Sequence, residues 1–504
     1  MAADLIVTLD AGTGSGRCVV FDTRGQPVAS AQEPLSYHFF SDPDLPMVRG
    51  FDLDPVAFWE TLGRCAREAL AQVPAGARIR GVIATSQREG CVFLDRAGEV
   101  LYAGPNLDAR GVAEAMEVQG VYPNDALHAI TGHAPPYIFP LVRFLWFRKR
   151  HDAGRVASLL MLNDWITYLL SGERGAEHSN AGESLLYDVS RRDWSPAILD
   201  AFDVPRDILP PIRPTGAEIG RVTATAAAAT GIPAGTPVFV GGADTESALL
   251  GSGAHDAGQT GAVLGTTSPV QMVMPAPLLD PAANLWTSCH VVGDRWVLES
   301  NGGDTGSSFR WLLELMFGAS DAAAHAKADA EALAVGFEGR PVFTHLGPAI
   351  FNLHDMNPFR AAGVLFRFPI LHVDRPTRGE IVHAFLENVA YAIRANCEQV
   401  EAVSGQTVGM LRVSGGMTQS RVLPQLLADT LGVPLAVSTV PESACLGSAV
   451  LAAVGAGFHP DVASAVVAMT RVLQVDPVAA RVPACDDRYR KWREIYATLR
   501  TVSL

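Results

Sequence analysis

The sequence has 504 residues, of which 48% are hydrophobic and 18% are charged, a composition that excludes an intrinsically disordered chain. At roughly 100–200 residues per domain, the length predicts two to four domains. Lys and Arg number 39 against 53 Asp and Glu, and the resulting net charge of −14 argues against a general nucleic-acid-binding protein, which needs a basic surface.

Lysine is rare in this sequence. The three lysines are Lys149, Lys327 and Lys491, and none of them follows a glycine. The phosphate loop GxxxxGK[ST] is therefore excluded, and no strand carries the phosphate-binding lysine of protein kinases. Any phosphate chemistry must instead use backbone N–H groups, arginine and metal ions.

Cysteine usage and hydropathy favour a reducing, cytoplasmic setting. The seven cysteines are odd in number and include no CxxC pair, which is typical of buried free thiols. The sequence shows neither a signal-peptide pattern nor an uncharged apolar stretch of 18 residues. We therefore expect a cytoplasmic protein without a membrane partner.

The N-terminal segment predicts a strand, a glycine-rich turn and a second strand. Residues 5–9 (LIVTL) are apolar, residues 10–16 (DAGTGSG) contain the turn, and residues 17–21 (RCVVF) are strand-like again. This order predicts a β-hairpin. A dinucleotide-binding glycine loop opens a helix instead, so we do not expect a Rossmann domain.

A helix and a third strand follow the hairpin. Asp54 and Pro55 are typical of an N-cap and a first helical residue, and apolar spacing predicts an amphipathic helix to about Val73. Residues 80–85 are strand-like. The first part therefore predicts a mixed α/β layer.

The middle of the chain contains a candidate domain boundary. Residues 224–235 are rich in Ala, Thr, Gly and Pro and lead into an apolar strand at 237–240. We place the boundary after this strand, which gives domains 1–242 and 243–504. Strands at 261–264 and 269–274 flank a second small-residue turn, so the hairpin pattern recurs.

The last part of the chain is also predicted to be α/β. Residues 380–403 have one apolar helical face, and residues 411–414 form a strand that ends at a glycine pair. A helix is expected from there to about Leu431, with Ser420 as a possible cap. Residues from 441 on predict a helix of very small residues, which can pack closely on a neighbour.

The first hairpin turn has the composition of a phosphate site. Turns with free backbone N–H groups bind anions, hydroxyls add donors, and a guanidinium can grip phosphate oxygens. The candidate phosphate ligands are Gly12, Thr13, Gly14, Ser15 and Arg17. Asp10, at the strand end, can hold Mg²⁺ through water. The alternative is a hairpin that simply turns.

A carboxylate follows the strand at 237–240. Asp244 comes directly after Gly241 and Gly242, in a position that a ligand can reach. Such an aspartate, with Thr245 beside it, can deprotonate a hydroxyl that attacks phosphorus. The alternative is that Asp244 is a helix N-cap, and the two roles are compatible.

Two further turns could bind the rest of a nucleotide. Gly265, Thr266 and Thr267 offer hydroxyl donors suited to phosphate oxygens, whereas Gly415 and Gly416 would let the backbone approach a flat ligand such as adenine. The alternatives are an ordinary hairpin turn and an ordinary strand-to-helix turn.

A polar cluster is predicted after the strand at 80–85. Arg88 and Glu89 can donate to and accept from sugar hydroxyls, and Asn106 and Asp108 supply further polar groups. The alternative is a surface salt bridge.

These motifs, in this order, resemble the FGGY family of carbohydrate kinases, within the sugar kinase/actin/Hsp70 superfamily, over about residues 5–455. The resemblance implies an α/β fold of two ribonuclease-H-like domains flanking a deep catalytic cleft. It implies a sugar-binding domain at 1–242, an ATP-binding domain at 243–504, and Mg²⁺ near Asp10. It also implies Asp244 as the general base, a small-molecule sugar or polyol as partner, and a possible homodimer.

The substrate within the family is less closely defined. The stretches FDLDPVAFW, SQREGCVFL and NLDARGVAE resemble autoinducer-2 kinases, which implies phosphorylation of open-chain 4,5-dihydroxy-2,3-pentanedione. The turn GTTS is nearer to xylulokinases, so a xylulokinase or another pentulose kinase is the alternative. A non-catalytic, actin- or Hsp70-like ATP-binding switch is the alternative from a different class.

Overall fold

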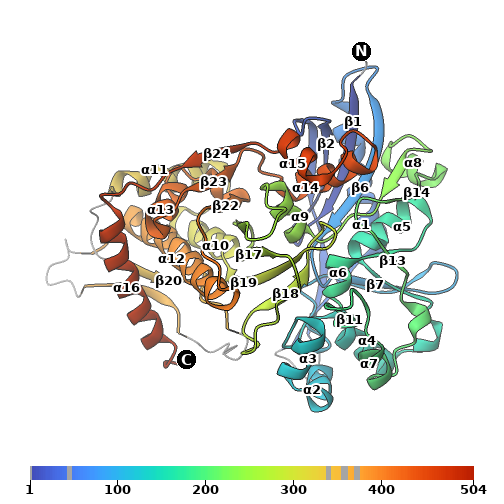
Figure 1. Cartoon of the computed structure of the whole chain (residues 1–504), viewed down its shortest axis with the longest axis horizontal. Helices are drawn as coiled ribbons and strands as arrows, with labels where there is room; N and C mark the ends of the chain where they lie inside the picture. The colour runs from blue at the N-terminus through green and yellow to red at the C-terminus, as the bar shows by residue number, and fades with distance from the viewer. Residues whose placement is uncertain (1–2, 42–47, 337–341, 353–360, 368–374, 504) are drawn as a thin grey trace. The chain divides into compact units, whose positions relative to one another are not determined.

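The computed structural model describes residues 3–41, 48–336, 342–352, 361–367 and 375–503. Within them the chain forms two compact units, each of mixed α/β structure (Figure 1). Unit 1 comprises Met1–Ala257, Val273–Val297 and Glu442–Thr470, and unit 2 comprises Gly258–Met272, Leu298–Pro441 and Arg471–Leu504. The expected α/β class is confirmed.

The main sheet of unit 1 has the strand order β14-β15-β6-β1-β2-β3. β1 (Asp4–Ala11) and β2 (Ser15–Asp22) form the expected antiparallel hairpin, and β6 (Arg78–Ser86) runs parallel to β1. The glycine-rich turn opens a strand, as predicted. The other strands are β3 (Pro27–Pro34), β14 (Glu218–Arg221) and β15 (Pro237–Phe239).

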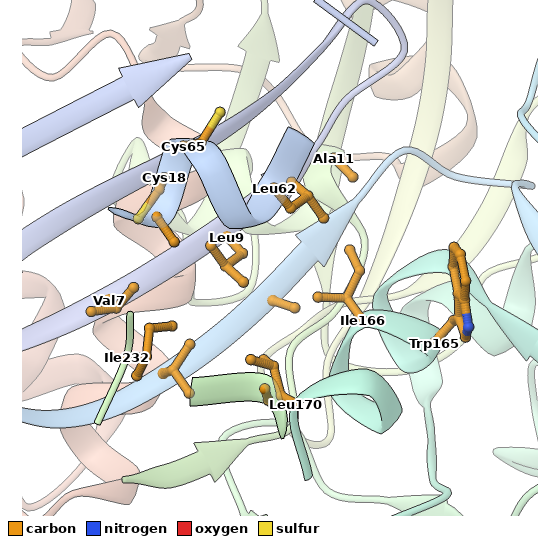
Figure 2. Close-up of a cluster of buried hydrophobic side chains, with 14 of the residues drawn as sticks. Val7, Leu9, Ala11, Cys18, Leu62, Cys65, Trp165, Ile166, Leu170 and Ile232 are labelled. Atoms are coloured by element: carbon orange, nitrogen blue, oxygen red, sulfur yellow. The ribbon is translucent and has the colours of Figure 1, made fainter. Parts of the chain in front are cut away.

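Helices on one face of this sheet enclose a hydrophobic core. α1 (Pro55–Ala71) begins where the sequence predicts, because the Asp54 carboxylate accepts hydrogen bonds from the first-turn N–H groups. α1 packs on β2 and β3, and α5 (Leu162–Ser171) packs on β6. Figure 2 shows Leu9 with Leu62 and Ile166 in this buried cluster.

The opposite face of the sheet is covered by a helix from late in the chain. α14 (Ser443–Gly455) packs on β1, β6 and α9 (Asp244–Gly251) (Figure 1). A Cβ atom on Gly447 would lie 1.9 Å from the Ser247 carbonyl oxygen. The small residues of α14 therefore permit the close helix contact expected from the sequence.

Smaller elements complete unit 1. They are β4 (Tyr37–Ser41), β5 (Arg49–Leu53), β7 (Cys91–Leu94), β8 (Val100–Gly104), β9 (Ser158–Met161), β10 (Ala176–Glu177), β11 (Tyr187–Asp188), β12 (Asp193–Trp194), β13 (Ile212–Arg213), β18 (Trp286–Cys289), α2 (Val112–Val121), α3 (Asn124–Thr131), α4 (Pro140–Arg150), α6 (His178–Gly182), α7 (Pro196–Ala201), α8 (Ala224–Thr230) and α15 (Val462–Met469).

Unit 2 repeats the strand pattern of unit 1. β16 (Thr260–Val263) and β17 (Thr267–Met274) are antiparallel, and β22 (Leu411–Ser414) runs parallel to β16. β23 (Leu435–Ser438) and β24 (Val472–Val475) continue the sheet. The second hairpin predicted from the sequence is therefore present.

Helices and short strands complete unit 2. α12 (Arg378–Ser404) begins with a capping box between Thr377 and Glu380. α13 (Leu423–Leu431) starts three residues after Ser420, whose hydroxyl accepts from the Leu423 N–H at 3.2 Å. The remaining elements are β19 (Trp296–Asp304), β20 (Val342–His345), β21 (Gly363–Phe366), α10 (Gly306–Phe317), α11 (Ala322–Val335) and α16 (Val482–Leu499).

No helix in the described part of the chain is both long enough and apolar enough to span a membrane.

Candidate functional site

The carboxyl ends of two parallel strands meet at one edge of the unit 1 sheet. Ala11 of β1 lies opposite Ser86 of β6, and Ser86 forms a parallel bridge to Ala243, just before α9. The residues that follow these strand ends are therefore brought together. This edge is where open α/β sheets commonly bind ligands.

Asp244 projects from this edge as the first residue of α9. The alternative N-cap role is wrong, because the cap residue is Ala243 and it makes no side-chain capping bond. The Asp244 carboxylate accepts a hydrogen bond from Thr245 Oγ1 at 3.1 Å. Burial and then the Asp10 charge raise the pKa of Asp244 to about 7, against the lowering effect of Arg88. A carboxylate with this pKa can serve as a general base near neutral pH.

The glycines before Asp244 allow the chain to approach β6 closely. A Cβ atom on Gly241 would lie 1.8 Å from the Ala84 carbonyl oxygen, and one on Gly242 would lie 2.7 Å from Ser179 Oγ. Neither position has room for a side chain. The glycine pair thus sets the distance between Asp244 and the end of β6.

Asp10 and Arg17 face each other across the first hairpin. Arg17 Nε lies 3.3 Å from Asp10 Oδ2, whereas Asp10 Oδ1 is buried and has no hydrogen-bond partner among the described residues. Burial raises the pKa of Asp10, and Arg17 opposes this. The orphaned oxygen fits a hydrated Mg²⁺, which would need further ligands, because the described residues include no group of three His, Cys, Asp or Glu able to hold a metal.

The hairpin turn beside Asp10 is braced by polar side chains. Gly12 N–H donates to the Ser15 carbonyl at 3.1 Å, and Arg17 Nη2 donates to Ser15 Oγ at 3.1 Å. Asn106 Nδ2 donates to Thr13 Oγ1 at 3.0 Å. The structure thus places Asn106 against the phosphate turn, while Gly14 is exposed at its tip.

Arg88 and Glu89 are both buried, with 7% and 5% of their surfaces exposed, so the alternative of a surface salt bridge is wrong. Arg88 Nη1 lies 3.5 Å from Glu183 Oε1 and 3.7 Å from Glu246 Oε1. The Arg88 guanidinium also lies over the Trp286 ring, 5.6 Å from its centroid. Two carboxylates and a π face therefore fix this cation.

A second polar group extends from Glu183. His133 Nε2 lies 3.3 Å from Glu183 Oε1 and 3.1 Å from Ser288 Oγ, and Ser288 Oγ donates to Glu183 Oε1 at 3.2 Å. All three side chains are buried. Glu183 keeps a low pKa because His133 and Arg88 offset its burial.

Glu89 has a backbone conformation that side chains rarely adopt, with φ of 57°. Arg143 Nη1 donates to its carbonyl at 2.8 Å and so helps to hold this conformation. Burial, followed by the charge of Glu183, raises the pKa of Glu89 to about 8. A protonated Glu89 can donate a hydrogen bond as well as accept one.

The Asp108 carboxylate forms its hydrogen bonds within the protein. Its carboxylate accepts hydrogen bonds from Tyr102 Oη at 2.5 Å, Arg110 Nε at 2.6 Å and the Phe51 N–H at 3.1 Å. It is fully buried, and these bonds connect it to β5 and β8 rather than to Asp244.

Unit 2 brings its two predicted turns together. The Leu264 N–H, beside Gly265, donates to the Ser414 carbonyl at 2.7 Å, and the Met417 N–H donates back to the Leu264 carbonyl at 3.2 Å. Thr266 and Thr267 are exposed, and Gly415 has φ of 97°. The glycine pair Gly415-Gly416 thus lies next to the second candidate phosphate turn, which is also in unit 2.

Two family models match this sequence. The N-terminal domain of the FGGY family of carbohydrate kinases matches residues 5–251, and the C-terminal domain matches residues 261–456. The chain belongs to the FGGY family of carbohydrate kinases. It is therefore a phosphotransferase that uses ATP and an alcohol acceptor.

Relatives and solved structures agree with this family membership. The autoinducer-2 kinase of Yersinia pseudotuberculosis is 33% identical over 91% of this chain and 87% of its own. The xylulose kinase of Rhodospirillum rubrum is 27% identical, with a TM-score of 0.82 over 98% of this chain and 99% of its own. Plasmodium falciparum glycerol kinase, at 20% identity, covers 98% of both chains with a TM-score of 0.82 and shares the fold. The expected ribonuclease-H-like fold in two domains is confirmed.

Several residues of the kinase's polar cluster were not predicted from the sequence. They are His133, Glu183, Glu246, Trp286 and Ser288. Glu246 lies two residues from Asp244 on the same short helix, so its closeness to the Asp244 motif in the sequence could have identified it. The others come from segments far from Arg88 in the sequence, and no local pattern marks them.

Proposed function

We propose that this kinase transfers the γ-phosphoryl group of ATP to a terminal hydroxyl of a small open-chain polyhydroxy ketone, with 4,5-dihydroxy-2,3-pentanedione as the preferred substrate. The observation that best supports this reaction is the position of Asp244. Its half-buried carboxylate lies at the strand edge with a pKa of about 7 and within the field of Arg88. The resemblance to an autoinducer-2 kinase at 33% identity supports the substrate.

The residues after β6 and those of the polar cluster orient the substrate. Arg88 supplies fixed donors to substrate oxygens, because Glu183 and Glu246 hold its other side. Glu89 can donate or accept. Asp244, with Thr245 beside it, takes the proton of the hydroxyl that attacks phosphorus. For Asn106 and Asp108 we propose supporting roles, Asn106 at the phosphate turn and Asp108 in the wall behind Glu89.

The glycine-rich turns bind the phosphates and adenosine of ATP. We assign Gly12, Thr13, Gly14, Ser15 and Arg17 in unit 1, and Gly265, Thr266, Thr267, Gly415 and Gly416 in unit 2. N–H and hydroxyl donors suit phosphate oxygens. Asp10 Oδ1 would hold Mg²⁺ through water, and the ion would neutralise negative charge on the phosphates.

A second candidate substrate is a pentulose such as xylulose. The 27% identity to the Rhodospirillum rubrum xylulose kinase along nearly all of both chains favours it. A non-catalytic ATP-binding switch fits less well, because such a switch has no use for the buried Arg88 cluster beside a carboxylate with a pKa near neutrality.

Three further assignments are proposals. We assign sugar binding mainly to residues 1–242, with Asp244 and Thr245 in addition, and ATP binding mainly to residues 243–504, with the phosphate turn at 12–17 in addition. We propose a homodimer by family resemblance. A reducing, cytoplasmic location is supported by seven cysteines that are all free and buried.

An ATP-consumption screen tests the substrate. The panel contains 4,5-dihydroxy-2,3-pentanedione, D-xylulose, D-ribulose, glycerol, erythritol, L-fuculose and gluconate. We expect the dione to give the highest kcat/KM. A large preference for a pentulose would contradict the substrate assignment and leave the kinase assignment in place. ATP turnover that no acceptor changes would favour the switch.

A further inference from the structure

The backbone before Asp244 is held by buried side chains from neighbouring elements. The Gly241 carbonyl accepts a hydrogen bond from Asn163 Nδ2 at 2.7 Å. The next carbonyl, that of Gly242, accepts from Thr85 Oγ1 at 2.8 Å. Asn163 belongs to α5 and Thr85 to β6, so two separate elements fix two successive peptide groups.

The N–H of the second of these peptide groups, that of Ala243, is held by α6. The Ala243 N–H donates to Ser179 Oγ at 2.9 Å, and Ser179 Oγ donates in turn to Glu177 Oε2 at 2.5 Å. Glu177 also accepts from Thr215 Oγ1 at 2.6 Å. Because the Ser179 hydroxyl donates to a fixed carboxylate, its lone pair stays aimed at the Ala243 N–H.

These three side chains, Thr85, Asn163 and Ser179, form what we call the Asp244 cradle. All three are completely buried, whereas Asp244 is partly exposed at the end of the segment that they hold. α9 starts at Asp244 without any side-chain cap. The cradle therefore supplies the side-chain hydrogen bonds that fix where the helix, and its first carboxylate, begins.

We propose that Thr85, Asn163 and Ser179 are positioning residues that set the place of the Asp244 carboxylate for proton removal. This inference rests on the proposed role of Asp244. The physical reason is that phosphoryl transfer depends on placement of the base, and a displacement of about 1 Å can reduce the rate about 100-fold. Groups held by packed, hydrogen-bonded neighbours keep their geometry, and groups on unsupported segments lose it.

Thr85 gives the sharpest test, because two substitutions separate its hydroxyl from its shape. Thr85→Val keeps the branched shape and removes the donor to Gly242. Thr85→Ser keeps the donor and removes a methyl group. We expect Thr85→Val to lower kcat roughly 10- to 100-fold with little change in KM for ATP or acceptor, and Thr85→Ser to recover most of the loss.

Ser179 gives an independent test with a matched control. Ser179→Ala removes the acceptor of the Ala243 N–H. Ser195→Ala removes a buried hydroxyl that also accepts a backbone N–H bond, from Ile198, at the start of α7. We expect the two variants to lose similar thermal stability, while only Ser179→Ala loses kcat by a comparable 10- to 100-fold factor.

The Asp244→Asn variant distinguishes a failure of the positioning role from a failure of the base assignment. If it abolishes turnover while Thr85→Val and Ser179→Ala turn over like Ser195→Ala, the positioning role is wrong and the base assignment stands. If Asp244→Asn turns over like the wild type, the base assignment itself is wrong. If Ser179→Ala does not fold, the Thr85 pair decides the matter alone.

Discussion

Arg88 Nη1 lies 3.5 Å from Glu183 Oε1, with both side chains buried in unit 1. The two residues are 95 positions apart in the sequence. A buried cation without a carboxylate partner costs several kcal/mol, and Glu183, together with Glu246 at 3.7 Å, offsets that cost for the Arg88 guanidinium. Because His133 and Ser288 hold Glu183 from the other side, the guanidinium has a fixed orientation before any substrate arrives.

The activity should have an acidic limb set by Asp244. The base must be deprotonated to accept a proton, and burial together with Asp10 raises its pKa to about 7. We therefore expect kcat/KM to fall as the pH decreases below about 7, approaching tenfold per pH unit. The measurement is kcat/KM from pH 5 to 9, with stability checked at each pH. A profile that stays flat down to pH 5 would show that no group of this pKa is required.

Glu89 should make the protein less stable as the pH rises. Its pKa of about 8 in the folded chain lies above the ordinary value of 4.5, so the folded state binds the proton more tightly than the unfolded state. Between about pH 4.5 and 8 this group destabilises the fold progressively with increasing pH. In Glu89→Gln, we expect Tm to decrease less between pH 5 and 8 than in the wild type. Equal slopes would contradict the raised pKa.

Arg143 should be required for folding. It is fully buried, and it donates to the carbonyls of Glu89, Asp108 and Ile138. Arg143→Met leaves three carbonyls without this donor, at about 1–3 kcal/mol for each buried group. We expect a loss of several kcal/mol in the free energy of unfolding, measured by urea denaturation.

Arg148→Met is the control for Arg143, since it changes an exposed arginine on the same helix α4. It should cost less than about 1 kcal/mol. Equal decreases in the free energy of unfolding in the two variants would show that the buried hydrogen bonds of Arg143 do not stabilise the fold.

Gly415 and Gly416 should differ in their tolerance of a side chain. Gly415 has φ of 97°, and a Cβ atom there would lie 2.5 Å from the Leu264 carbonyl oxygen, whereas a Cβ atom on Gly416 meets nothing within 4 Å. Gly415→Ala should lower the free energy of unfolding by about 1–3 kcal/mol. Gly416→Ala should leave Tm nearly unchanged. Equal Tm values for the two variants would contradict the strained conformation.

Local sequence patterns predicted the parts of the fold that depend on local physics. The first hairpin, the start of α1 at Asp54 and the small-residue helix α14 follow from strand alternation, capping and residue size. Asp10 and Asp244 could be singled out because each ends a strand or follows one. The second hairpin, formed by β16 and β17, also follows from the sequence pattern.

The rest of the site depends on tertiary contacts. Trp286 reaches Arg88 from β18, and Ser179 reaches Ala243 from α6. No motif or residue spacing in the sequence predicts these two contacts. Asp108 also depends on such contacts, because its carboxylate accepts hydrogen bonds from Tyr102 and Arg110, which the sequence around it does not indicate. Whether a polar side chain faces a ligand or its own protein is decided by neighbours that lie far away in the chain.

The most direct test of the account is turnover by Asp244→Asn, measured together with ATP affinity. The amide keeps the shape of the carboxylate but cannot accept the proton, so kcat should fall about 10²–10⁴-fold while the Kd for ATP stays within about threefold of the wild type. Asp200→Asn, at an exposed position on α7, should behave like the wild type in both measurements. A kcat for Asp244→Asn close to that of the wild type would contradict the assignment of Asp244 as the base.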